Sequence, residues 1–181
     1  MVALAVAGAA AGLLVRAYAG DNGDGGTGNA SALPADLRDF ARGWPLDGCT
    51  RDGTPGDKQD ERWRCPVDGS TSLYLIRYQP GGHRDTIRER NDRMKPLAGK
   101  IRLERGPASA PGGAKGLYRE YEVDIGSAGR PDWNDQIWFD NYPVQSPPLA
   151  LILRTARTPD TAQALAHLRE LWAKAGYSRP A

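Results

Sequence analysis

The chain has few of the residues that build metal centres and nucleophilic active sites. Its 181 residues include only two histidines, His83 and His167, and two cysteines, Cys49 and Cys65. Neither histidine lies at a metal-ligand spacing from a cysteine, and neither lies near a serine or cysteine in a recognisable nucleophile motif. From these shortages we expect no metal site and no cofactor.

Strong charge of one sign is also missing. The 24 basic and 22 acidic residues leave a net charge of +2. Such a small net charge creates no dominant field that would attract a polyanion. We therefore expect no nucleic-acid partner.

A long uncharged run is present at the N-terminus, where residues 1–15 read MVALAVAGAAAGLLV. As a helix, residues 1–19 would span ~28 Å, close to the ~30 Å thickness of a bilayer core. A cleaved signal segment is the alternative, because AYA-G at 17–20 fits a small-x-small cleavage site, although a basic n-region is missing. A core helix is a third interpretation, but the Gly-rich residues 20–32 leave it nothing to pack against.

These patterns predict three parts. Residues 1–19 form a hydrophobic helix that serves as a transmembrane anchor or signal segment, and residues 20–32 form a flexible linker. Residues 33–181 form an extracytoplasmic domain of a single-pass membrane protein, or a secreted domain if cleavage occurs near Ala19. In an oxidising compartment Cys49 and Cys65 most simply form one disulfide, because no companion ligands support a metal pair.

Hydrophobic periodicity within residues 33–181 indicates an α+β fold. A short helix is expected over 33–44, with Leu37, Phe40 and Ala41 on one face. Two short strands surround the disulfide, and a polar helix is expected over 83–96. Further strands are predicted at 71–79, 100–105, 116–125, 135–142 and 149–156, with a loop over 106–113.

Residues 116–125 alternate in the manner of a half-buried antiparallel strand. One side carries Leu117, Tyr121, Val123 and Ile125, and the other carries Tyr118, Glu120, Glu122 and Asp124. The sequence 71–79 is apolar on both sides, which is typical of a covered central strand.

The last helix has clear boundary signals. Thr158 is the expected cap, Pro159 the first helical residue, and Gly176 the stop. Its apolar stripe, which should pack on the sheet, consists of Leu165, Leu168, Trp172 and Ala175, with His167 opposite and exposed. The expected architecture is an antiparallel sheet with helices packed on one face, and the order of elements suggests an internal pseudo-repeat.

The letters His83-Arg84-Asp85 followed by Asn91 are similar to a protein-kinase catalytic loop. Kinase chemistry, however, places the asparagine five residues after the aspartate, and that position here is Arg90. A Gly-rich phosphate loop and an Asp-Phe-Gly sequence are also absent from the chain. The letters are better explained by an exposed, charged helix.

Residues 130–143, RPDWNDQIWFDNYP, hold the candidate site. Alternation places Trp138, Asp140 and Tyr142 on one side of a strand, where with Trp133 they could bind a saccharide or peptide. A hydrolase that uses the carboxylates of segment 132–140, Asp135 or Asp140 among them, is the alternative. A strand filled with packing aromatics is the structural interpretation of the same residues.

The order of these features resembles a known class of modules. The apolar segment, the Gly-rich linker and the early cysteine pair are followed by SLYLIRY, QIWFD, LALILRTA and a final Leu/Trp helix. Over residues 45–175 this is similar to the extracytoplasmic sensor-like modules of actinobacterial Ser/Thr kinases and related membrane proteins, without the kinase domain. Frequent Arg, Ala, Gly and Pro are typical of such genomes.

This resemblance implies a membrane-tethered sensor or interaction domain without catalytic activity. Its partner would be a membrane or envelope protein, or a wall saccharide. A wall-acting hydrolase and a subunit that assists a membrane partner are the remaining interpretations.

Overall fold

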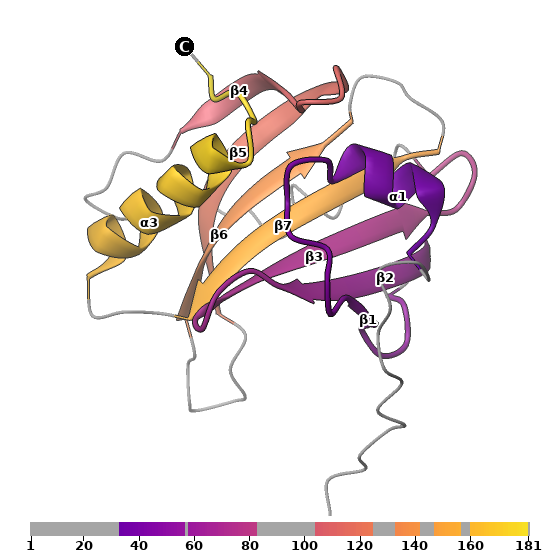
Figure 1. Ribbon diagram of the computed structural model, residues 1–181, viewed down its shortest axis with the longest axis horizontal. Coiled ribbons are helices and arrows are strands. Elements are labelled where there is room, and N and C mark those ends of the chain that lie inside the picture. Colours follow the sequence, from indigo (N-terminus) through magenta and orange to yellow (C-terminus); the bar gives the residue numbers. More distant parts are fainter. Residues whose placement is uncertain are drawn as a thin grey trace, which may run out of the picture.

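A computed structural model describes residues 33–56, 58–82, 104–124, 133–141, 147–156 and 160–180. Seven strands form one antiparallel sheet in the order β1-β2-β3-β7-β6-β5-β4 (Figure 1). The strands are β1 (Thr50–Arg51), β2 (Gln59–Pro66), β3 (Thr71–Tyr78), β4 (Arg105–Ser109), β5 (Lys115–Asp124), β6 (Trp133–Asp140) and β7 (Leu149–Ala156). The helices are α1 (Ala35–Phe40) and α3 (Thr161–Lys174). The predicted antiparallel sheet with helices is therefore confirmed.

Several expectations concern residues outside these ranges. They are the apolar segment 1–19, the linker 20–32 and the polar helix at 83–96. Among the described residues, no helix has the length and apolar character needed to cross a bilayer.

The sheet consists of two meanders that meet at its centre. Strands β1 to β3 pair in sequence order, and strands β4 to β7 do the same from the opposite edge. The last strand of each meander joins the two, because β3 and β7 pair antiparallel over Thr71↔Thr155 to Arg77↔Leu149. This arrangement has the symmetry that a pseudo-repeat would produce, although the repeat itself stays a prediction.

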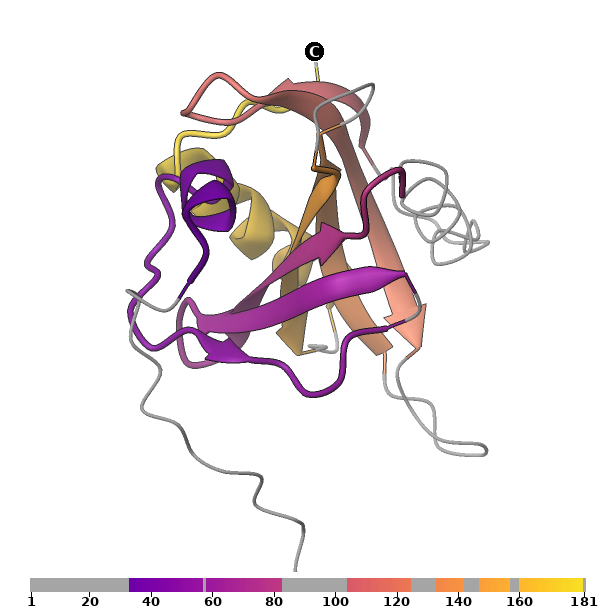
Figure 2. The same ribbon diagram turned by 90° about the vertical axis from the view of Figure 1, so that its right-hand side faces the viewer.

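Both described helices lie on the same face of the sheet, as Figure 2 shows. Leu37 and Phe40 of α1, and Leu165, Leu168 and Trp172 of α3, are buried against it. The expected apolar faces of both helices are thus confirmed. Trp172 lies at the centre of this core, with its ring 4.6 Å from that of Tyr177 and 5.2 Å from that of Tyr118.

The opposite face of the sheet has its own apolar cluster. Its members come from four neighbouring strands and are all buried: Tyr74, Ile76, Tyr78, Tyr121, Trp138, Ala150 and Ile152. Strand β3 contributes to both clusters, since Leu73 and Leu75 point toward the helices. The prediction of a central strand that is covered on both sides is confirmed.

The disulfide between Cys49 and Cys65 is present. Both cysteines are fully buried in the core on the helix side. The bridge fixes the start of β1 to the end of β2, so it closes the excursion whose tip is polar. The predicted pairing is confirmed.

Two boundaries differ from expectation. The predicted loop 106–113 begins with β4, which pairs with β5 from Arg105↔Arg119 to Ser109↔Lys115. Gly106 and Pro107 indicate a turn in the sequence, so the strand was not predicted. Pro107 is tolerated in it because β4 is at the edge of the sheet. At the last helix, Asp160 rather than Thr158 is the cap, and its side chain accepts hydrogen bonds from the N–H groups of Ala162 and Gln163.

Part of the polar side of β5 does not face solvent. Tyr118 and Glu120 on that side are buried beneath α3, where Arg169 binds the Glu120 carboxylate through two nitrogens at 2.7 Å each. Tyr118 and the backbone N–H of Glu104 donate to the same carboxylate. Desolvation alone would raise the pKa of Glu120, but these donors, Arg169 first among them, hold it below its ordinary value.

Candidate binding site

The structure buries the centre of the site expected from sequence. Trp138 and Asp140 have 0% relative exposure, and the Trp138 indole Nε1 donates to the Asp140 carboxylate at 2.7 Å. Both side chains belong to the face opposite the helices, where Trp138 packs in the second apolar cluster. A ligand has no direct access to either residue in this conformation, so the expected open platform is not formed here.

Asp135, the carboxylate proposed for a hydrolase, is 1% exposed. It lies on the strand side opposite to Trp138 and Asp140, so the two carboxylates do not face each other. Glycoside hydrolysis needs two carboxyl groups that flank one bond in the substrate. Asp132, the side chain of Trp133 and Tyr142 lie outside what the structure describes.

A cavity is present elsewhere, between α1, the turn that joins β4 to β5, and the ends of β6 and β7. Its volume is about 350 Å³, at the low end of the range for small-ligand sites. The residues that line it are Asp36, Asp39, Phe40, Gly112, Gly113, Ala114, Asn141, Pro147 and Leu149. It therefore combines two carboxylates with an apolar wall made by Phe40, Pro147 and Leu149.

The carboxylate of Asp36 is held in place from the sheet. Arg77 of β3 donates to it through Nε at 3.0 Å and also through Nη2. Arg77 also lies 3.4 Å from Glu61, which in turn pairs with Arg51 at 2.7 Å. Burial by itself would lower the pKa of Arg77, but Asp36 raises it above its ordinary value. The cavity wall thus has a fixed acceptor whose orientation depends on α1 and β3 together.

Asn141 fixes the opposite wall. Its side-chain nitrogen donates to the carbonyl of Pro147 at 3.0 Å, and its side-chain oxygen accepts from the N–H of Leu149 at 3.0 Å. Asn141 is 4% exposed, so these bonds form in a largely dry setting. At the third wall, Gly112 has no side chain, and a Cβ there would lie 3.4 Å from the carbonyl oxygen of Asp39.

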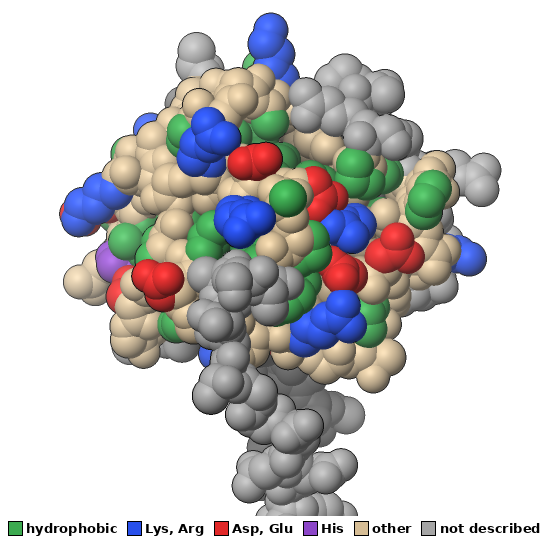
Figure 3. Space-filling view, turned by 45° about the vertical axis from the view of Figure 1, so that its right-hand side comes forward, with side chains coloured by type: hydrophobic (Ala, Val, Ile, Leu, Met, Phe, Trp, Pro, Cys, Tyr) green, Lys and Arg blue, Asp and Glu red, His purple; other side chains and the backbone are tan. Residues whose placement is uncertain are grey.

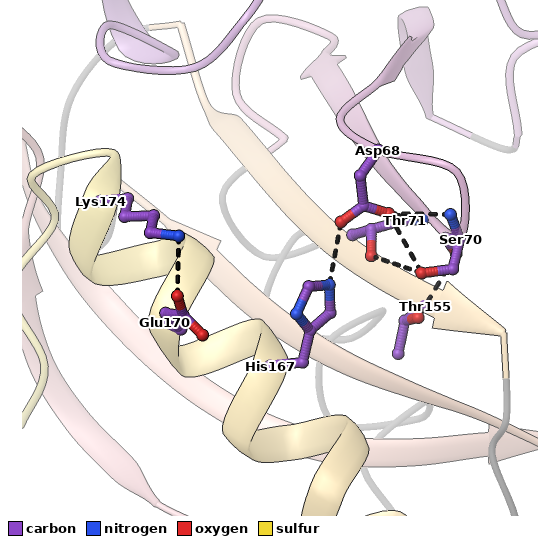
Figure 4. Close-up of polar contacts among 7 residues, drawn as sticks. All are labelled: Asp68, Ser70, Thr71, Thr155, His167, Glu170 and Lys174. Atoms are coloured by element: carbon purple, nitrogen blue, oxygen red, sulfur yellow. Dashed lines mark hydrogen bonds and ion pairs between the residues drawn. The ribbon is translucent and has the colours of Figure 1, made fainter.

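A second polar cluster joins the β2–β3 turn to α3 (Figure 4). Asp68 accepts from the N–H groups of Ser70 and Thr71 at 2.8 and 2.7 Å, and its other oxygen lies 2.9 Å from Nε2 of His167. Burial alone would raise the pKa of Asp68, but the hydrogen bonds from Ser70, His167 and Thr71 lower it to about 2. The His167 side chain is 40% exposed, and its ring is bonded to this carboxylate.

The side chains of this cluster are arranged to hold two segments together and not to form a catalytic triad. A catalytic triad needs the serine hydroxyl on the histidine. Here the Ser70 hydroxyl lies 3.1 Å from Asp68 and 3.5 Å from the hydroxyl of Thr71. The chain separation of 99 residues between Asp68 and His167 shows what the contact does: it ties a hairpin turn to the last helix.

Charges are mixed on the face of the molecule that Figure 3 shows. Figure 3 shows acidic and basic side chains interspersed, with apolar patches between them, as the small net charge implies. Within the described ranges, no group of three or more His, Cys, Asp or Glu side chains is placed to hold a metal ion.

No protein family matches the chain, and no curated protein or solved structure shows significant similarity to it.

One signal for the cavity is present in the sequence. Arg77 is a charged residue inside an otherwise apolar strand, and such a residue needs an acidic partner when its strand is covered. That partner, Asp36, lies 41 residues earlier in α1. The other walls come from the β4–β5 turn and from Asn141–Leu149, and no local pattern links these segments.

Proposed function

We propose that this chain is a membrane-tethered extracytoplasmic sensor or interaction domain, and that it binds its ligand without transforming it. The observation that carries the proposal is the cavity beside α1, where Arg77 fixes the Asp36 carboxylate next to an apolar wall. The buried disulfide supports a location outside the cytoplasm, because such bridges persist in oxidising compartments. The apolar residues 1–19 supply the tether.

The cavity favours a ligand with hydrogen-bond donors beside an apolar part. Carboxylates accept from hydroxyl or amine groups, while Phe40 and Leu149 offer contact to carbon. A saccharide or peptide fragment of the cell envelope has both features. This ligand class fits binding better than the hydrolase alternative, since the cavity holds its carboxylates at a helix surface and Asp135 and Asp140 are buried.

The test is a titration of the full chain with soluble wall saccharides and wall peptides, in which tryptophan fluorescence reports binding. Gly112→Leu should fill the cavity and weaken binding, and Asp39→Asn should remove one acceptor. Asp47→Asn is the matched control, because it removes an exposed carboxylate that does not line the cavity. Equal binding by Gly112→Leu and the parent chain would show that the cavity is not the site.

The location has a separate test. Cell fractionation combined with a thiol-reactive label should find the chain in the envelope fraction with Cys49 and Cys65 blocked. Recovery in the soluble interior with both thiols reactive would contradict the proposal.

A further inference from the structure

Three arginines converge on one tyrosine ring on the face of the sheet opposite the helices. The guanidinium carbons of Arg154, Arg62 and Arg64 lie 4.5, 5.0 and 6.0 Å from the ring centroid of Tyr74. Strand pairing builds this group: Arg64 of β2 lies opposite Tyr74 of β3, and β7 on the other side of β3 supplies Arg154. This group lies on the other face of the sheet from the α1 cavity, whose lining residues Phe40 and Leu149 belong to the core on the helix side.

The three cations are close enough to repel one another. Because all of them lie within 6.0 Å of one point, their separations are on the order of a Debye length at physiological salt. The face of the Tyr74 ring attracts each guanidinium through its quadrupole, but the ring is neutral and cannot balance their charge. An anion that reaches this group would be attracted by all three guanidiniums at short range.

The three arginines differ in their partners. Asp52 pairs with Arg62 at 2.7 Å. Arg64, in contrast, donates to the neutral hydroxyl of Ser72 at 3.2 Å, and its other contact is the Tyr74 ring. Arg154 donates weakly to the Tyr74 hydroxyl at 3.5 Å, and with the Gln136 amide oxygen turned toward it the Nε–O distance is 2.7 Å. Within the described part of the chain, Arg64 therefore keeps a cationic group without a carboxylate.

The members of the cluster differ in how deeply they are buried. Tyr74 is 7% exposed and the Arg62 side chain 20% exposed, so they form the floor, while Arg64 is exposed at the rim. A guanidinium presents planar pairs of N–H donors that match the oxygens of a phosphate group, and several such groups can share its oxygens. Water screens the attraction between a partly buried guanidinium, such as that of Arg62, and a phosphate less than it would for a fully exposed lysine.

We propose that Arg62, Arg64 and Arg154, arranged around Tyr74, form a binding site for a phosphate group. The group would belong to a phosphorylated envelope polymer or to a phospholipid head group, because both present the same oxyanion. The site is independent of the saccharide or peptide cavity beside α1.

Two measurements with the full chain test the site. In the first, inorganic phosphate is titrated by calorimetry, with acetate at the same ionic strength as the comparison. In the second, binding to vesicles of phosphatidylglycerol is compared with binding to phosphatidylcholine vesicles, which corrects for insertion of the apolar residues 1–19. If the chain binds both inorganic phosphate and phosphatidylglycerol vesicles, the source of the phosphate group is a polymer or free phosphate. If it binds phosphatidylglycerol vesicles but not inorganic phosphate, the source is a lipid head group.

Arg64→Gln is the decisive variant, because its exposed side chain can be replaced without opening the core. We expect it to weaken phosphate binding about tenfold or more, as loss of a charge-assisted bond does. Arg38→Gln, which removes an exposed arginine of α1, should bind within about twofold of the parent chain. Thermal unfolding of both variants confirms that the fold is intact.

Three results would overturn the site. They are no saturable binding in either experiment up to about 10 mM phosphate, equal binding by Arg64→Gln and the parent chain, and equal weakening by Arg38→Gln. The last result would mean that diffuse surface charge, and not the cluster around Tyr74, attracts the anion.

Discussion

Arg169 of α3 forms a bidentate ion pair with Glu120 of β5, with Nε and Nη2 each 2.7 Å from a carboxylate oxygen. The Glu120 side chain has no exposed surface, whereas that of Arg169 is 27% exposed. The pair therefore joins the last helix to the strand beneath it through a charge that water cannot reach. The pKa of Arg169 is raised, chiefly by its hydrogen bonds to Glu120, so the pair is ionised at neutral pH.

Arg169→Met should destabilise the domain by about 3 kcal/mol, the low end of the range for breaking a buried ion pair, because one partner is partly exposed. Most of this loss comes from the Glu120 carboxylate that stays buried. Urea unfolding measures the change. The double variant Glu120→Gln with Arg169→Met should recover part of it, and no recovery would contradict this explanation.

Lys174→Gln is the matched control on the same helix. Its partner Glu170 is 62% exposed and Lys174 is 68% exposed. A surface pair of this kind contributes little to stability, because solvent screens it. A loss comparable to that of Arg169→Met would mean that helix charge in general, rather than the buried pair, stabilises α3.

Asp68 should give the domain a stability that depends on pH below about 4. Its pKa in the folded protein is lowered to about 2, so folding favours the ionised form. The resulting stabilisation is fully present above the unfolded pKa of ~3.9 and is lost as pH falls toward 2. In Asp68→Asn this part of the pH dependence should be missing, as measured by urea midpoints between pH 2 and pH 5. An unchanged pH profile would contradict the assignment.

Loss of the disulfide should destabilise the fold strongly. In the chain-entropy model, a bridge that closes a loop of this length contributes about 3 kcal/mol. The paired change Cys49→Ala with Cys65→Ala should therefore lower the urea midpoint markedly. It should also steepen the transition, because the unfolded chain without the bridge exposes more surface. Because both cysteines are buried, a reductant should act slowly on the folded parent chain and quickly in urea. Fast reduction in buffer would argue against this burial.

Trp138→Phe should affect stability rather than ligand binding. The change removes the bond from the indole to Asp140 and leaves a gap in the second apolar cluster. The expected cost is about 2–3 kcal/mol from the lost volume and hydrogen bond. Fluorescence titration of the same variant with wall fragments should give the affinity of the parent chain. A selective loss of binding without loss of stability would instead support the binding site at Trp138 and Asp140 that the sequence predicted.

Sequence reasoning worked best where the signal was local. Apolar stripes located α1 and α3, hydrophobic patterning located β5 to β7, and the two cysteines left one simple pairing. It failed at β4, because Gly106 and Pro107 are turn residues everywhere except at a sheet edge. It also misplaced the start of α3, whose cap is Asp160 and not Thr158.

The candidate site was harder to predict because burial is decided by tertiary structure. Alternation correctly placed Trp138 and Asp140 on one side of β6, but it could not tell that this side is covered. For β5, the side that carries Glu120 looked polar in sequence and is covered by α3. The contacts that define the cavity and the arginine cluster join strands that are distant in sequence, such as Arg154 with Tyr74.

The position of β7 has a consequence for how the domain folds. β7 pairs with β3 on one side and β6 on the other, so it closes the only seam between the two meanders of the described sheet. Until residues 149–156 dock, β3 and β6 each expose a row of backbone groups that is ready to pair with another chain. Folding is thereby delayed until nearly the whole polypeptide is available, and a chain interrupted before β7 would be prone to aggregation.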